Sequence, residues 1–382
     1  MISSVYGINP YVSSDVGFYE FLPLHPNSQN IVYTDYETGI RTYLCDNADC
    51  SHDNENCPSW FEGIAGLQFA INPYNNQLFL FQAGIPADNG SQKIYSMDLN
   101  GANRKLLLQL PSDEYIVDGC AVDKDNLYFT VRTPASDWEH VTKELRQLNI
   151  ETGEMVLLMG YGGTDGLMGA FDDQLVIVSM ERASETYTYY TFSLTTKELQ
   201  EFYRYTVADT SGQGWGNIAR CHGDQLYIVE PTANLKASIH QMDIMSGETH
   251  TITTELPYYT LDGTFVEDFV DNHMIIRVAD NRVPGAVVLY QYAVDLATNT
   301  LMEITLAYTP ADRYANAAYI VGVSDTHYLV LTAEEYRVIA QAEPDGTQYT
   351  VDMPFFVYSM ITKEDYWNGV ANYLPIEDTV LV

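Results

Sequence analysis

The chain has 382 residues, 46% of them hydrophobic, and it carries 52 acidic against 18 basic side chains, for a formal net charge of −34. A surface this negative repels phosphate backbones and anionic headgroups, so neither nucleic acid nor an anionic membrane is expected as a partner. No stretch approaches the ~20 apolar residues of a membrane span, and none is predicted. The surplus of carboxylates serves solubility or, alternatively, attracts cations and cationic ligands.

Seven segments share one pattern, in which a short polar turn leads into a run of strand-forming residues; Asp224–Val229 is the clearest. Measured at equivalent residues, the segments recur at intervals of 60, 49, 48, 51, 48 and 54 residues. Such a period with strand-type content predicts a β-propeller with one blade per repeat. Between Phe18 in the first repeat and Tyr328 in the last, the residues expected at equivalent inner-strand positions are Leu78, Leu127, Leu175, Leu226 and Met274.

Each repeat carries a second turn signal downstream, such as Tyr36–Gly39 or Ile150–Gly153, so each blade is predicted to have four strands. The expected fold class is therefore all-β, a seven-bladed β-propeller of four-stranded antiparallel blades, forming a single domain over residues 1–382. In chain order, the blades are expected at about residues 5–46, 66–113, 118–160, 166–207, 217–257, 263–308 and 319–380.

Local sequence adds details in three blades. The first strand of blade one is expected within Tyr6–Tyr11, where Pro10 weakens it. In blade three, one helical turn within Glu139–Leu148 is an alternative to continuous strand. In blade seven, the sequence predicts a long loop within Glu335–Asp352 and a tight turn at Ile361–Glu364.

Strand alternation predicts which end of the blades binds a ligand. The first and third turns of each blade are short and share one end, whereas the longer second loops and the connections between blades share the other. Long loops on a rigid scaffold commonly carry binding residues. Trp60, Trp138 and Trp215 fall at the long-loop end and Trp367 at the other. The first three either cap the blade ends or form a rim on which a sugar or peptide stacks.

A compact cluster follows blade one, within an insertion at residues 45–61. Three thiols and one imidazole in thirteen residues are the usual donors of a closed structural zinc site. One disulfide with a free thiol, or three unliganded thiols, are the alternatives. The predicted metal ligands are Cys45, Cys50, His52 and Cys57.

Backbone geometry explains how the four side chains would converge. An extended segment would point Cys50 and His52 to one side, and a turn at Asp53–Asn56 would return Cys57. Nearby carboxylates would favour a cation and raise the thiol pKa values; they belong to Asp46, Asp49, Asp53 and Glu55. The two remaining cysteines, Cys120 and Cys221, are predicted to be buried thiols.

No nucleophile elbow or zinc-protease motif is present in the sequence. Paired acids such as Asp172-Asp173 arise by chance among so many carboxylates, so no catalytic residue is assigned. Three functions remain open: a binding module, a propeller enzyme acting on polysaccharide, and a scaffold without a small ligand. An enzyme requires converging titratable groups at the channel mouth, whereas a binding module requires only an aromatic and polar rim.

The Tyr-rich start, with Tyr43-Leu44-Cys45 and Cys57-Pro58-Ser59-Trp60-Phe61 around Cys50-x-His52, resembles uncharacterised TolB-type propeller proteins of anaerobic Gram-positive bacteria. The segment Thr362–Tyr366 is similar to theirs as well. That family is a domain of unknown function, and many members follow a lipoprotein leader. The resemblance implies export and anchoring at the cell surface. Because Met1–Ser4 is neither basic nor apolar, a leader has been removed from this chain or, alternatively, the chain is cytoplasmic.

The sequence therefore favours a non-enzymatic, monomeric propeller at the bacterial cell surface that binds an unknown glycan, peptide or protein through its long-loop face. One structural Zn²⁺ is the only cofactor expected. The alternative is a lyase or glycosidase acting on polysaccharide, with its site at the central channel.

Overall fold

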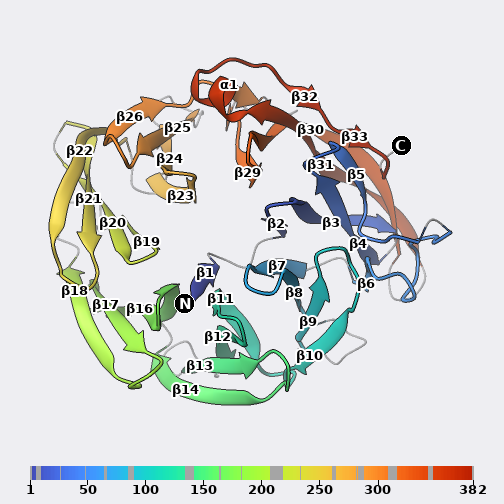
Figure 1. The fold of residues 1–382 in the computed structure, drawn as a ribbon, viewed down its shortest axis with the longest axis horizontal. Helices are drawn as coiled ribbons and strands as arrows, with labels where there is room; N and C mark the ends of the chain where they lie inside the picture. Colours follow the sequence, from blue (N-terminus) through green and yellow to red (C-terminus); the bar gives the residue numbers. More distant parts are fainter. Residues whose placement is uncertain are drawn as a thin grey trace. The chain divides into compact units, whose positions relative to one another are not determined.

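The computed structural model describes residues 2–5, 10–25, 27–47, 49–63, 67–84, 90–133, 142–162, 165–181, 183–206, 218–232, 234–259, 264–280, 282, 288–308, 316–342 and 347–380. The chain is almost entirely β and forms seven four-stranded antiparallel blades, so the predicted seven-bladed β-propeller is confirmed (Figure 1). Within the described ranges, no helix combines the length and apolar character needed to cross a membrane.

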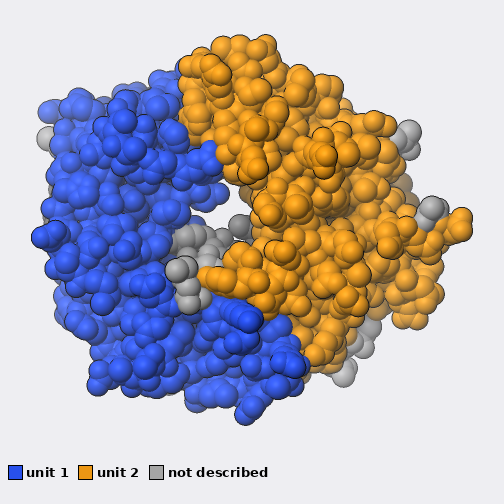
Figure 2. Space-filling model, in the orientation of Figure 1, with its two compact units in different colours: residues 1–7, 115–305, 314–317 blue, residues 8–114, 306–313, 318–382 orange. Residues whose placement is uncertain are grey.

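The chain divides into two compact units, one of residues 1–7, 115–305 and 314–317 and the other of residues 8–114, 306–313 and 318–382 (Figure 2). The first unit holds blades three to six. Its strands are β1 (Ser3–Val5), β11 (Tyr115–Val122), β12 (Asn126–Thr133), β13 (Thr142–Asn149), β14 (Met155–Gly162), β15 (Gly166–Phe171), β16 (Gln174–Glu181), β17 (Thr186–Ser193), β18 (Leu199–Thr206), β19 (Ile218–His222), β20 (Gln225–Pro231), β21 (Lys236–Asp243), β22 (Thr249–Pro257), β23 (Thr264–Val270), β24 (His273–Asp280), β25 (Val288–Asp295), β26 (Thr300–Glu303) and β28 (Asn316–Ala317).

The second unit holds blades one, two and seven, and it contains every candidate site described below. Its elements are β2 (Tyr11–Ser13), β3 (Gly17–His25), β4 (Ser28–Asp35), β5 (Ile40–Tyr43), β6 (Trp60–Glu62), β7 (Leu67–Asn72), β8 (Gln77–Gln82), β9 (Lys93–Asp98), β10 (Lys105–Gln109), β27 (Ala307–Tyr308), β29 (Ile320–Val323), β30 (His327–Ala342), β31 (Gln348–Thr362), α1 (Lys363–Trp367), β32 (Leu374–Pro375) and β33 (Glu377–Asp378).

The repeat residues occupy one structural position. Each is the second residue of the second strand of its blade, and each is fully buried. The expected equivalence is thus confirmed for Leu78, Leu127, Leu175, Leu226 and Met274, and it extends to Phe18 and Tyr328.

The third turn of the blade, which joins its last two strands, is stabilised by local hydrogen bonds. In five blades the last residue of the third strand accepts a hydrogen bond from the backbone N–H three residues later, which closes the turn; these acceptors are Asp35, Asn149, Ser193, Asp243 and Asp295. The residue that follows the N–H donor has positive φ in each of these turns, as at Gly39 and Asn299. Residues that tolerate this conformation therefore mark the turn in the sequence.

Two local predictions are corrected, and the described part of a third region follows its strand interpretation. The sequence assigned Val5 to blade one, but β1 pairs with β11 and adds a fifth strand to blade three, where its backbone groups occupy the open edge of β11. Glu139 lies outside the described residues, while Thr142–Asn149 is strand throughout. The predicted tight turn at Ile361–Glu364 is the start of α1, because Thr362 caps the helix by accepting from the backbone N–H of Asp365.

The predicted loop within Glu335–Asp352 is largely strand. The hairpin of β30 and β31 stays paired as far as Ala342 and Gln348. Alternate side chains on one face of it, including Ile339 and Phe355, pack against Leu22 of blade one. This burial extends the hairpin, because a polar loop there would leave that apolar surface in water.

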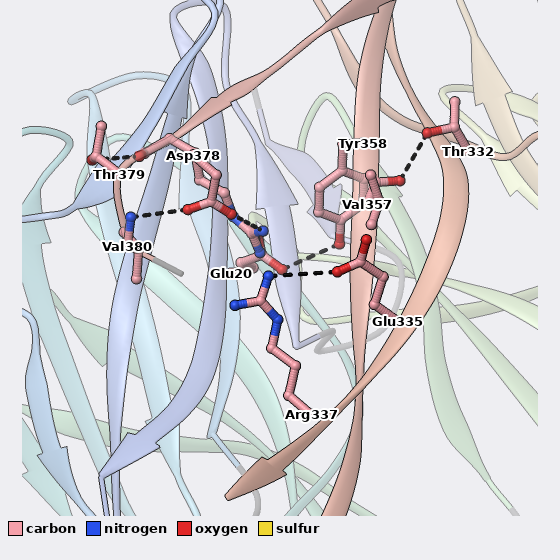
Figure 3. Close-up of polar contacts among 10 residues, drawn as sticks. Glu20, Thr332, Glu335, Arg337, Val357, Tyr358, Asp378, Thr379 and Val380 are labelled. Carbon is pink, nitrogen blue, oxygen red and sulfur yellow. Dashed lines mark hydrogen bonds and ion pairs between the residues drawn. The ribbon is translucent and has the colours of Figure 1, made fainter. Parts of the chain in front are cut away.

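The C-terminal segment pairs with blade one and contacts a buried ion pair there through a partly exposed carboxylate (Figure 3). Strand β33 pairs in parallel with β5, placing Asp378 opposite Arg41. The Arg41 guanidinium contacts Glu20 at 2.5 Å and Asp378 at 3.0 Å, and the Tyr358 hydroxyl donates to Glu20 at 3.2 Å. These contacts join β3 and β5 of blade one to β31 of blade seven and to the C-terminal strand.

Candidate functional site

The cysteine-containing insertion interrupts the outer strand of blade one. Both β5 and β6 pair antiparallel with β4, one along each half of it. At the gap, Ile31 accepts from the backbone N–H of Leu44 at 3.0 Å and donates to the Ser59 carbonyl at 2.8 Å. Sequence had placed the insertion in a connection between blades. It lies in mid-strand instead, because Trp60–Glu62 resumes the hydrogen bonding that Ile40–Tyr43 began.

The insertion brings together all four predicted metal ligands. The candidate ligand atoms of Cys45, Cys50, His52 and Cys57 lie within 4.8 Å of one another. His52 Nδ1 is 3.3 Å from Cys57 Sγ, and Cys57 is fully buried. All five cysteines of the chain are free thiols in the structure.

The backbone reaches this arrangement by a route that the sequence did not predict. His52 has φ +56°, a left-handed conformation, so the segment is not extended as expected. Two contacts hold it there. The buried amide of Asn30 donates to the His52 carbonyl at 2.8 Å, and the Tyr43 ring stacks on the imidazole with centroids 4.1 Å apart. The expected return turn is present, with the Cys57 N–H donating to the Asn54 carbonyl at 3.0 Å.

The protonation of Cys45 reflects its surroundings. Burial, followed by the neighbouring thiols of Cys57 and Cys50, raises the pKa of Cys45 to about 11. The nearby carboxylates, which the sequence predicted to raise it as well, are not among the largest contributions. Three thiols and an imidazole within reach of one centre can coordinate a tetrahedral metal ion once the thiols are deprotonated. Cys57 Sγ also lies 3.1 Å from the Ser59 hydroxyl, a contact that would orient the ligand.

The other two cysteines match the prediction of buried thiols. Cys120 and Cys221 are almost completely inaccessible, and burial raises the pKa of each to about 12. They lie in β11 and β19, among the cores of blades three and five.

A polar pocket of about 180 Å³ lies beside the insertion, between blades one and two. Trp60 lines it from β6, where it pairs with Asn30, so this residue is in a strand and not in a loop as predicted. The pocket borders the long-loop end, where β6 and β8 finish and β9 begins. The other polar residues that line it are Glu55, Glu62, Gln82, Lys93 and Arg104.

Arg104 ties this pocket to the insertion. Its guanidinium donates to the carbonyls of Trp60 at 2.7 Å and Pro58 at 3.1 Å, and it lies 4.7 Å from the Phe61 ring centre. Nothing in the local sequence indicated this residue, because its role depends on blade two packing against blade one.

The structure describes one of the other three tryptophans. Trp138 and Trp215 lie outside the described residues. Trp367 is in α1, where its indole donates to the Tyr328 hydroxyl at 3.0 Å and packs edge-on against Tyr366. This half-buried ring therefore packs against the core of blade seven.

No protein-family model matches the chain, and no curated protein matches it by sequence. Among solved structures, an oligogalacturonate lyase in complex with manganese is 12% identical, with TM-score 0.57 over 96% of this chain and 92% of that one. An acylaminoacyl peptidase from Pyrococcus horikoshii is 12% identical, with TM-score 0.53 over 93% of this chain and 58% of that one. TolB from Acinetobacter baumannii is 10% identical, with TM-score 0.40 over 79% of this chain and 62% of that one.

At these identities, the likeness to the lyase and the peptidase shows the propeller fold alone. The chain spans less than two thirds of the peptidase and TolB chains. The resemblance to TolB-type proteins of anaerobic Gram-positive bacteria stays a prediction.

Proposed function

We propose that this chain is a non-enzymatic binding propeller that acts as a monomer at the bacterial cell surface. It recognises an oligosaccharide in the Trp60 pocket at the long-loop end of blades one and two. One Zn²⁺, held by Cys45, Cys50, His52 and Cys57, stabilises the insertion that forms one wall of this pocket. The observation that carries the proposal is the convergence of these four side chains directly beside a pocket of mixed aromatic and polar character.

The donor set supports zinc. Three thiolates and one imidazole form the usual closed, tetrahedral site, in which the metal cross-links the chain and leaves no open position for a substrate. The insertion has 16 residues between Tyr43 and Trp60 and contributes few large apolar side chains, so a metal would supply the stability that a core otherwise provides. The propeller blades have their own cores and would remain folded without it.

The composition of the pocket supports a hydroxyl-rich ligand. Trp60 offers an aromatic surface on which a sugar ring stacks. The carboxylates of Glu55 and Glu62 accept hydrogen bonds from hydroxyls, while the Lys93 ammonium donates them. A peptide is the main competitor for the same surface.

Zinc content tests the metal. Elemental analysis of protein made under reducing conditions is expected to give about one Zn²⁺ per chain for the unmodified protein and for Cys120→Ser, a buried thiol outside the cluster. Cys50→Ser is expected to lose the metal while keeping its propeller circular-dichroism spectrum. Near-zero zinc in all three proteins would reject the metal, and mass spectrometry of unreduced peptides would then locate any disulfide.

Ligand binding is tested on combined glycan and peptide arrays. We expect signal on glycans alone. This signal should be lost in Trp60→Leu and Glu62→Gln but kept in Glu37→Gln, a substitution at the opposite end of blade one. Peptide signal with the same dependence would replace the oligosaccharide by a peptide. Incubation with the bound glycan should return it uncleaved, whereas unsaturated or hydrolysed products would favour a lyase or glycosidase.

A further inference from the structure

A second cavity, of about 300 Å³, lies at the short-turn end of blades one and two, apart from the Trp60 pocket. Three tyrosines line it, one from each of β3, β4 and β5, together with apolar side chains and one carboxylate. The residues that define its character are Tyr19, Tyr33, Tyr43, Leu44, Leu99 and Asp46. The volume is at the lower limit of typical small-molecule sites.

The rings are held in place by the fold. Tyr19 and Tyr33 pack with centroids 5.0 Å apart. A side chain at Gly17 would collide with the Tyr33 ring, since its Cβ would meet Cε2 at 2.2 Å, so glycine is required there for this ring position. Tyr43 is fixed by stacking on His52. Tyr19 is itself fully buried and supports the Tyr33 ring, so the partly exposed rings of Tyr33 and Tyr43 form the accessible part of this preformed aromatic cage.

The electrostatics of the cage are negative. The Asp46 carboxylate lines the cavity directly. The Asp35 carboxylate accepts a hydrogen bond from the Tyr33 hydroxyl at 3.0 Å, so a second negative charge lies at the edge of the Tyr33 ring. Of the nine described residues that line the cavity, none is basic. Burial, with smaller contributions from the charges of Asp15 and Asp35, raises the pKa of Tyr19 to about 12. An anionic ligand would be repelled here.

We propose that this cage binds a quaternary ammonium group, the trimethylammonium head of a choline-like ligand. Aromatic faces attract such a cation through their quadrupoles, and the attraction grows when the cation leaves water. A quaternary ammonium has no N–H to satisfy, so a site built of rings and methyl groups removes it from water without breaking hydrogen bonds. Asp46 and the net charge of −34 supply the long-range attraction. The cavity is separate from the proposed oligosaccharide pocket, but Cys45, a proposed zinc ligand, also lines it.

The test is calorimetric titration with choline, beside the neutral tert-butyl analogue in which carbon replaces the nitrogen. The analogue has the same shape but no charge, so it is expected to bind about tenfold more weakly or worse. Equal affinity for the two ligands would overturn the proposal, and so would failure of the folded protein to bind choline.

Variants locate the site. Tyr43→Leu is expected to weaken choline binding about tenfold, whereas Tyr43→Phe keeps the ring and should weaken it less than about twofold. Tyr74→Leu should leave choline binding unchanged, because that exposed side chain is outside the cavity. Zinc content is measured in each variant, since Tyr43 also contacts His52. Asp46→Asn leaves the rings intact and is expected to weaken binding about threefold at low salt and less at high salt. Choline affinity unchanged in both Tyr43→Leu and Asp46→Asn would place the ligand elsewhere and refute the site.

Discussion

Replacing Arg41 by Met would leave the carboxylate of Glu20 buried without its cation. The side chains of Arg41 and Glu20 are 4% and 6% exposed and meet at 2.5 Å, so water cannot replace the lost partner. Removing one member of a buried ion pair costs about 3–5 kcal/mol of the free energy of unfolding. The lost contact with Asp378, which is 28% exposed, adds at most about 1 kcal/mol.

The expected change in melting temperature follows from the size of the chain. An unfolding entropy of about 2.1 cal/mol/K per residue gives roughly 0.8 kcal/mol/K for 382 residues unfolding together, so the variant should melt about 4–7 °C lower. Urea unfolding followed by circular dichroism provides the free energy, and hydrogen exchange of the backbone at Asp378–Val380 reports release of the C-terminal clasp. Arg204→Met is the matched control. Its 2.6 Å pair with Glu201 is 55% and 42% exposed, so water can replace the lost partner and the free energy of unfolding should change far less than in Arg41→Met.

Two results would refute this account of the clasp. One is equal destabilisation by Arg41→Met and Arg204→Met. The other is a Glu20→Leu, Arg41→Met double variant no more stable than Arg41→Met, because replacing both charges by apolar groups should recover most of the loss.

Two further predictions concern the metal cluster and the core. Because the pKa of Cys45 is raised to about 11, this thiol is protonated in the metal-free protein at neutral pH and must release its proton on binding. Zinc affinity should therefore fall by up to about tenfold per pH unit, for this one ligand, as the pH is lowered. Competitive chelation measures the affinity, and a value independent of pH would contradict the prediction. Leu226 is fully buried at a repeat position, so Leu226→Ala should lower the free energy of unfolding by about 2–5 kcal/mol. Leu199 is 45% exposed on β18, so Leu199→Ala should change that free energy by about 0.5 kcal/mol. Comparable losses in urea unfolding would contradict the equivalence of the repeat positions.

The sequence alone determined the architecture, because the period is written in local chemistry. A polar turn followed by a buried residue such as Leu226 recurs in each blade, and turn closure by a side chain such as Asp243 with a following Gly247 needs only five consecutive residues. The composition of the metal cluster was equally visible, since its four side chains lie within thirteen residues.

Tertiary structure decided where the cluster lies, what surrounds it and how the chain ends are held. Trp60–Glu62 resumes the outer strand only because β4 offers unpaired backbone groups beyond Tyr43, and Asp378 reaches Arg41 from 337 residues away. The tyrosine cage joins residues of three strands to a turn of the next blade. Such contacts depend on which edges and faces remain free once the blades have formed, and hydrogen bonding between distant segments leaves no periodic trace in the sequence.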